Sequence, residues 1–296
     1  MSTVINLDVI QTNFLSLVQS VGLTKDMIMS EIDENSQCRW SINHNVSINS
    51  YFSKDLRELV SLFEFSTKAK ISGDDLTALC ALMRAGFRAH ILHNLFEDIW
   101  SDVDKVLYID ERFSWPPIPD GYQIPHHFLM AGADALKRMA APGDTANPAV
   151  LMLWENATGE VGVIEKERVD VIRKTFIALA ESIGISREKM DNKIGEDDQF
   201  EWCIDYADSL GERLEKDLNE LLLFFEAHRI AIQNNDQLAA YVALMEAGIC
   251  AQTVSNFFLN IKDKVDEVTI LDKRFSWPII PDSYKFPEHL MASLGC

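Results

Sequence analysis

Five polar residues between positions 110 and 127 occur again 162 positions later, and their types could do chemistry. The first set is Asp110, Arg112, Asp120, Tyr122 and His127, and the second is Asp272, Arg274, Asp282, Tyr284 and His289. An arginine, two carboxylates, a phenol and an imidazole suit the binding of an anion or a carboxylate, and the imidazole could act as an acid or base. The structural alternative is that the arginine satisfies an acid or helix-end carbonyls while the aspartate caps a turn. Both interpretations stay open, and the structural one is preferred.

A second group of residues could hold a metal ion. His90, His93 and Glu97 have the spacing i, i+3, i+7, which places them on one face of a predicted helix, and imidazole and carboxylate are zinc ligands. The positions 162 residues later hold Gln252, Ser255 and Leu259. A metal site would therefore exist in one half only, so ordinary polar roles are preferred and no metal or cofactor is predicted.

The sequence contains none of the common catalytic motifs. There is no GxGxxG after a predicted strand, no P-loop, no GxSxG and no HExxH. No nucleophile with its base is recognisable either. These observations leave the question of an enzyme open and favour a protein that is not one.

The polar set belongs to a longer segment that the chain carries twice. It reads RFSWPPIPDGYQIP at 112–125 and RFSWPIIPDSYKFP at 274–287, an offset of 162 (274 − 112). The same offset, without a gap, aligns Phe14 with Phe176, Trp40 with Trp202 and Gly86 with Gly248. Such self-similarity predicts a tandem duplication. We expect a first domain at 1–134, a connector at 135–165 and a second domain at 166–296.

The prolines of the repeated segment exclude a regular helix or a central strand. We therefore expect an extended proline-rich loop that closes each domain, with Trp115 and Trp277 anchored in the core. In the connector, VLMLWENATGEVGVI has two apolar runs around a turn sequence, which predicts a β-hairpin.

Apolar periodicity predicts a mainly α-helical protein with about five helices in each half. Long helices are expected at 52–70 and 213–232, and Thr24, Asp74 and Asp236 suit N-caps of helices that follow them. Alanines recur on one face of the next helix in each half, where they would let another helix approach closely. They are Ala78, Ala81, Ala85 and Ala89 in the first half and Ala240, Ala243, Ala247 and Ala251 in the second. The duplication resembles a fused homodimer, which predicts either a monomer with a pseudo-twofold axis or a homo-oligomer.

Composition restricts the class of protein. The net charge is −19, and a chain this acidic lacks the basic face that direct nucleic-acid or anionic-membrane binding needs. No run approaches the roughly 20 apolar residues of a membrane helix, and the N-terminus has no signal-peptide pattern, so cytoplasmic residence is expected. The cysteines Cys38, Cys80, Cys203, Cys250 and Cys296 occupy no equivalent positions. A disulfide framework or zinc site shared by both halves is therefore excluded.

These observations favour a protein-interaction module, such as an adaptor, an inhibitor or an immunity-type protein, with two acidic domains. The negative charge predicts a basic protein partner and association that weakens with salt. One alternative is an enzyme or small-ligand binder that uses the repeated Arg, Asp, Tyr and His group. Another is a mimic of nucleic acid with an acidic surface.

Overall fold

The computed structural model describes residues 3–32, 39–140, 162–164, 166–187, 190 and 204–287, and the protein is mainly α-helical. The first half contains β1 (Thr3–Ile5), α1 (Asp8–Ser20), α2 (Lys25–Ser30), α3 (Ile48–Ile71), α4 (Asp75–Asp104), the π-helix η1 (Lys105–Ile109) and α5 (His126–Ala140). The rest of the chain contains β2 (Gly162–Ile164), α7 (Lys166–Ser182), α9 (Leu210–Gln233), α10 (Gln237–Asp266) and the π-helix η2 (Glu267–Leu271).

Side-chain caps explain where the helices begin. Thr24, Asp74 and Asp236 accept hydrogen bonds from the backbone N–H groups of the first turns of α2, α4 and α10, as predicted. Ser47 and Ser209 do the same for α3 and α9, which therefore begin before the predicted starts at 52 and 213. An N-cap satisfies one of the free N–H groups of a first turn, so these residues set the helix starts.

The same offset relates the bounds of six elements. Each bound of α9, α10 and η2 equals the corresponding bound of α3, α4 and η1 plus 162. Helical periodicity did not indicate the π-helices, because one widened turn at the end of a long helix leaves the pattern of apolar residues nearly unchanged. Both halves nevertheless widen the helix at the same place, immediately before the proline-rich loop.

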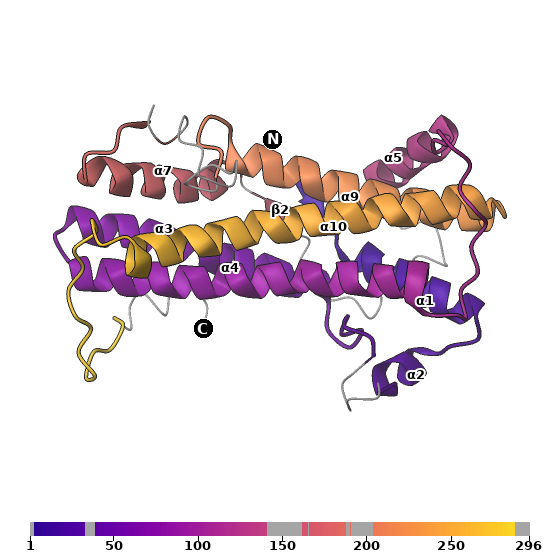
Figure 1. Cartoon of the computed structure of the whole chain (residues 1–296), viewed down its shortest axis with the longest axis horizontal. Coiled ribbons are helices and arrows are strands. Elements are labelled where there is room, and N and C mark those ends of the chain that lie inside the picture. Colours follow the sequence, from indigo (N-terminus) through magenta and orange to yellow (C-terminus); the bar gives the residue numbers. More distant parts are fainter. Residues whose placement is uncertain are drawn as a thin grey trace.

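The helices α4 and α10 lie side by side through the centre of the molecule (Figure 1). A Cβ added at Gly86 would lie 2.8 Å from Val265 Cγ1, and one added at Gly248 would lie 2.9 Å from Val103 Cγ1. Val265 is the counterpart of Val103, so the glycine of each helix faces the equivalent valine of the other helix. The two helices are antiparallel, because lower residue numbers on one meet higher numbers on the other.

Between these crossing points, counterparts meet directly. The ring of Phe96 stacks on that of Phe258 with 6.0 Å between centroids, and 258 equals 96 plus 162. The hydroxyl of Ser255 lies 2.6 Å from Nδ1 of its counterpart His93. Contacts between a position and its own equivalent occur where an axis of symmetry would pass.

The first helix of each half packs on the other half. Phe14 of α1 packs on Phe225 of α9 with 5.6 Å between ring centroids, and Phe176 of α7 packs on Phe63 of α3 at 5.3 Å. Positions 176 and 225 are the counterparts of 14 and 63. One hydrophobic core cluster consequently contains buried residues from both halves.

The predicted alanine face receives a helix from the first half. Phe128 of α5 is buried in a small cluster with alanines of α9 and α10, namely Ala227, Ala231, Ala239, Ala240 and Ala243. At Gly132 a Cβ would lie 3.3 Å from the backbone nitrogen of Ala227. Small side chains therefore permit the close approach of α5 to α9, and the predicted alanine face of α10 contributes Ala240 and Ala243 to the same cluster.

The end of the connector pairs with the first strand of the chain. β2 pairs antiparallel with β1, and Thr3 lies opposite Ile164. The first apolar run of the predicted hairpin, 150–154, lies outside the described residues, so the hairpin stays a prediction. The short β1–β2 sheet connects the first residues of the chain to the start of α7.

Within the described residues, one helical stretch, Gln237–Leu271, is long and apolar enough to cross a membrane by length and composition alone. This stretch is α10 with η2. Its apolar residues include Phe257, Phe258 and Ile261, which are buried in the shared core. Packing inside the bundle therefore accounts for its composition.

Candidate functional site

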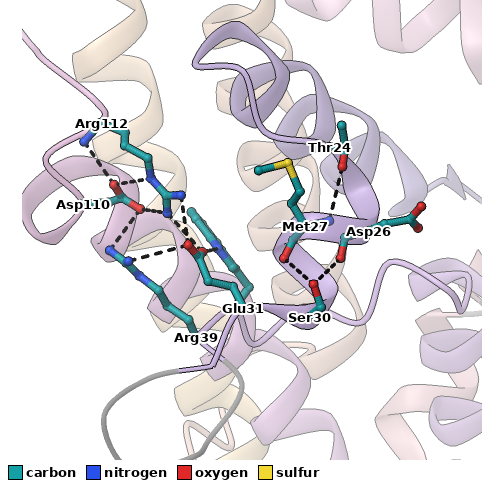
Figure 2. A network of polar contacts seen from close by, with 9 residues as sticks. Thr24, Asp26, Met27, Ser30, Glu31, Arg39, Asp110 and Arg112 are labelled. Carbon is teal, nitrogen blue, oxygen red and sulfur yellow. Dashed lines mark hydrogen bonds and ion pairs between the residues drawn. The ribbon is translucent and has the colours of Figure 1, made fainter.

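The first proline-rich loop begins in a network of ion pairs (Figure 2). Arg112 donates from Nε to Asp110 Oδ1 at 2.8 Å, and from Nη1 and Nη2 to the two carboxylate oxygens of Glu31 at 2.9 and 3.0 Å. Arg39 Nη2 lies 3.2 Å from Asp110 Oδ2, and the indole N–H of Trp40 donates to Glu31 Oε2 at 2.7 Å. Two carboxylates and two guanidinium groups thus join the loop to the segment after α2.

The network favours the charged forms of Glu31, Asp110 and Arg112. Hydrogen bonds from Arg112 lower the pKa of the carboxyl of Glu31 and that of Asp110. The same bonds, to Asp110 first and Glu31 second, raise the pKa of Arg112. Because the guanidinium already donates to both carboxylates, its geometry supports the structural interpretation, in which Arg112 satisfies acids of the protein itself.

The second loop keeps the inner pair. Arg274 donates from Nε to both oxygens of Asp272 at 2.9 Å, and these bonds lower the pKa of Asp272. The position equivalent to Glu31 is Lys193, which lies outside the described residues. The Arg274 side chain is more exposed than that of Arg112, 48% against 30%.

The other predicted residues do not join this network. Asp120 and His127 are exposed, and His289 lies outside the described residues. Tyr122 lies near Asp236, the N-cap of α10, and its counterpart Tyr284 has its hydroxyl 3.0 Å from the hydroxyl of Thr77 at the start of α4. The loop tyrosines therefore reach the helix starts of the opposite half, at some distance along the loop from Asp110 and Arg112.

The two loop tryptophans hold the loops in the same way. The indole of Trp115 donates to the carbonyl of Val106 at 3.0 Å, and that of Trp277 donates to Val268 at 2.7 Å. Trp115 also stacks on Tyr241 of α10, with ring centroids 5.4 Å apart. On the other side, the Lys70 amine lies 4.8 Å from the ring centroid of Trp277. Each loop is thus fastened both to its own π-helix and to the other half.

The His90, His93 and Glu97 group engages a hydroxyl of the opposite helix. The His90 and His93 rings stack with 5.9 Å between centroids, and Ser255 donates its hydroxyl to Glu97 Oε1 at 2.9 Å. In the described part of the chain, no group of three or more His, Cys, Asp or Glu side chains is placed to hold a metal ion. The contacts with Ser255 give His93 and Glu97 polar partners on the opposite helix.

The α3–α4 pair buries two carboxylates around one arginine. Arg88 contacts Asp55 Oδ1 at 3.0 Å and Glu58 Oε2 at 2.6 Å, and both acids are almost fully buried. Lys54 Nζ lies 4.0 Å from Glu58 Oε1, and the buried carboxylate of Glu58 also contacts Arg88 from the next helix. In the second half Cys250 replaces Arg88, and burial raises the pKa of its thiol to about 12, which leaves it unreactive at neutral pH.

A carboxyl on α4 has a strongly shifted pKa. Burial, with the charge of Asp102 one turn away, raises the pKa of Asp98 to about 6. The equivalent residue in α10 is Asn260, which has no charge to bury. A lone shifted carboxyl is one feature of an active site, but the charged groups that act on Asp98, namely Asp102, Lys105 and Glu97, do not belong to the repeated set.

Exposed apolar side chains are a further repeated feature, and residue types alone did not indicate it. Tyr108 and Ile109 on η1 are 61% and 64% exposed, and their counterparts Ile270 and Leu271 on η2 are 64% and 70% exposed. Ile118 and Ile280 in the loops, and Phe87 and Ile249 on α4 and α10, are likewise exposed equivalents. Aligning the halves by burial rather than by residue type would have found them, but burial was not known from the sequence.

We name two surfaces from these residues. The first apolar surface comprises Tyr108, Ile109 and Ile118, and the second apolar surface comprises Ile270, Leu271 and Ile280. Tyr108 and Trp115 both lie against Tyr241, which brings η1 and the first loop together. Figure 1 places η1 and η2, and hence the two surfaces, at opposite ends of the bundle.

Comparison with known proteins identifies one similarity. Residues 169–279 match the model of a family of unknown function (DUF6853). The match begins in α7 and ends in the second proline-rich loop, so it covers α9, α10 and η2 but not the first half. No curated protein and no solved structure matches the chain.

Proposed function

We propose that this protein is a cytoplasmic protein-interaction module, of the adaptor, inhibitor or immunity type, whose partners dock on the first and second apolar surfaces. The observation that carries the proposal is the exposure of large apolar side chains at equivalent positions of both halves. Core packing explains matching residues that are buried, but it gives no reason to keep Ile109 and Leu271 in water. Exposed large apolar side chains that gather on one surface are a usual feature of protein interaction sites.

Charge supports the choice of a protein partner. Exposed acids stand beside the first surface, with Glu111 two residues after Ile109 and Asp120 two residues after Ile118. An apolar centre with a charged rim is the usual anatomy of a protein interface. A net charge of −19 further favours partners that are basic.

We also propose that the chain arose by tandem duplication and folds as a monomer with a pseudo-twofold axis, each half closed by its proline-rich loop. Support comes from the reciprocal contacts of Gly86 with Val265 and Gly248 with Val103. The facing counterparts Phe96 and Phe258 lie where the axis would pass. The axis would relate the two apolar surfaces to one another, so that both could present the same shape to a partner.

The alternative of an enzyme or small-ligand binder has weaker support. It needs Arg112 to receive an anion, whereas Arg112 already donates to Glu31 and Asp110. It also needs Tyr122 and His127 near Arg112, whereas Tyr122 lies by Asp236 and His127 is exposed on α5.

Site-specific photo-crosslinking tests the proposal. A benzophenone amino acid replaces Ile109 or Leu271, and in a control it replaces Ile71, which is 82% exposed but has the polar counterpart Gln233. In native lysate we expect a discrete protein adduct from position 109 or 271 and none from position 71. Equal adducts from all three positions, or none from any, would overturn the assignment of the apolar surfaces.

A further inference from the structure

The two proline-rich loops carry charges of opposite sign. Residues 110–125 contain one base and three acids, a net charge of −2, whereas residues 272–287 contain three bases and two acids, a net charge of +1. The windows are equivalent, because each bound differs by 162. The loops have therefore kept their apolar and proline residues while their charge has diverged.

Ion pairing within the loops sharpens the contrast. Arg112 pairs with Asp110 and Arg274 with Asp272, so these charges cancel in both loops. Of the acids and bases that remain, Glu111 is replaced by Lys273 and Gln123 by Lys285, while Asp120 and Asp282 are alike. All five of these charged residues are exposed. The first surface thus lies beside two acids, and the second lies beside two lysines and one acid.

We propose that the two surfaces have diverged in specificity, and that a basic amphipathic protein segment docks on the first apolar surface and not on the second. This inference rests on the proposed function. The apolar anchors are equivalent at the two ends, so they supply similar contact without distinguishing partners. Rim charges then decide between partners, because juxtaposed like charges disfavour binding and opposite charges favour it.

A second copy of the chain is the competing occupant. Opposite loop charges at opposite ends could in principle pair head to tail, which would build an open filament. A net charge of −19 on each copy opposes that assembly, since whole-protein repulsion keeps like-charged proteins apart. The net negative charge of the protein attracts a basic segment. The local charge beside the apolar residues is also negative at the first surface, but not at the second.

The test uses a defined probe, a 14-residue lysine–leucine peptide that forms a basic amphipathic helix, titrated calorimetrically into the full chain. We expect one site in low salt, lost in Ile109→Asp and retained in Leu271→Asp. Exchanging the rim charges should transfer the preference. Glu111→Lys should weaken the site about tenfold at low ionic strength and much less at high salt, and Lys273→Glu should add a second site.

Other results would overturn either the divergence of the two surfaces or the surfaces themselves. Two equal sites, each removed by its own aspartate variant, or an unchanged affinity in Glu111→Lys, would overturn the divergence while leaving the apolar surfaces as docking sites. Binding that ignores both aspartate variants would overturn the docking surfaces themselves, and with them the proposed function. Concentration-dependent assembly of the free chain in analytical ultracentrifugation, abolished by either aspartate variant, would assign the surfaces to a second copy instead.

Discussion

Substituting Gly86 by alanine tests whether the centre of the bundle is as tightly packed as the geometry indicates. The added Cβ would lie 2.8 Å from Val265 Cγ1, closer than Cβ atoms approach other atoms in folded proteins, and 3.2 Å from Val265 Cβ, which is tighter than most such contacts. Val265 is buried and β-branched, so its χ1 angle has little freedom to change. Either the valine leaves its rotamer or α4 and α10 move apart.

Two opposing terms set the size of the effect. Alanine is favoured over glycine inside a helix by about 1 kcal/mol. Overpacking a well-packed core costs about 1–3 kcal/mol. We therefore expect Gly86→Ala to lower the free energy of unfolding by about 1 kcal/mol, measured by urea denaturation followed by circular dichroism, with the m-value unchanged.

A double-mutant cycle isolates the contact. Val265→Ala alone should cost about 2 kcal/mol, from lost apolar burial and the cavity left behind. In that background the 2.8 Å contact with Cγ1 is gone and only the 3.2 Å contact with Cβ is left, so Gly86→Ala should stabilise by up to about 1 kcal/mol, which gives a coupling of up to about 2 kcal/mol. The pair Gly248 and Val103, with its Cβ contact at 2.9 Å, is an internal repeat of the experiment. A gain in stability from Gly86→Ala that is equal in both backgrounds would refute the close crossing.

Four further predictions follow from contacts described above. Trp115→Phe removes the donor to the Val106 carbonyl and should cost about 1–3 kcal/mol in urea denaturation, with a similar cost for Trp277→Phe at its equivalent bond; a cost at only one site would contradict the equivalence of the loops. Arg112→Gln should lower stability by about 2 kcal/mol at neutral pH, because it removes the partner that lowers the pKa of Glu31 and Asp110. Stability from a lowered carboxyl pKa is present above the unfolded value and lost as pH falls through the folded value, so the variant and the native chain should converge in acid denaturation. Asp98→Asn should stabilise by about 1 kcal/mol at pH 8 and by progressively less as pH falls below about 6, because a raised pKa destabilises the folded state only where the carboxyl is ionised; a pH-independent effect would contradict the shift. Fragments 1–140 and 162–296 should form a folded 1:1 complex when co-expressed and should each lose helical circular dichroism alone, since Phe14 and Phe176 pack on the opposite half; two stable monomeric halves would contradict that packing.

Local structure was largely predictable from the sequence, because its causes are local. Helix starts follow from short side chains that cap a first turn, and Thr24, Asp74 and Asp236 each do so. The ends of α3 and α4 and the corresponding ends of α9 and α10 agree with the offset of 162, which only required counting. Prolines interrupt regular structure whatever surrounds them, and the structure assigns neither helix nor strand to 111–125.

The partners of the apolar faces were not predictable in the same way. An apolar stripe on α1 indicates that another element packs on it, but the sequence does not indicate whether that element is α3 or α9. Each of α1 and α7 could pack on α3 or on α9, whose apolar faces are similar. The periodicity of apolar residues does not distinguish between the two. The exposed Ile109 and Leu271 were missed for a related reason. They continue an apolar helix in the sequence, and they are exposed at the ends of the π-helices η1 and η2, which the periodicity did not indicate.

The polar residues of the two halves were the hardest to interpret, because equal contacts can be made with unequal groups. Asp102 and Lys105 form an ion pair at the end of α4, and Lys264 and Glu267 form the equivalent pair at the end of α10 with the charges reversed. The reversal preserves the pair but changes what else it can do. Asp102 accepts hydrogen bonds from the backbone N–H groups of Ser41 and Ile42 at 2.8 Å, whereas the side chain of Lys264, at the equivalent position, has no acceptor atom.

The segment that carries Arg39 and Trp40 is therefore held to α4 by the carboxylate of Asp102, whose counterpart in the second half is Lys264. This difference bears on how the repeated residues should be read. Arg112 and Arg274 are identical, and each bonds its own aspartate. The pairing with Asp110 and Asp272 is thus the contact that the two arginines share. Differences that set the halves apart in function should be sought where charge is exposed and unpaired within the loop, as at Glu111 and Lys273, because reversing a charge there alters what the surface attracts without disturbing the fold.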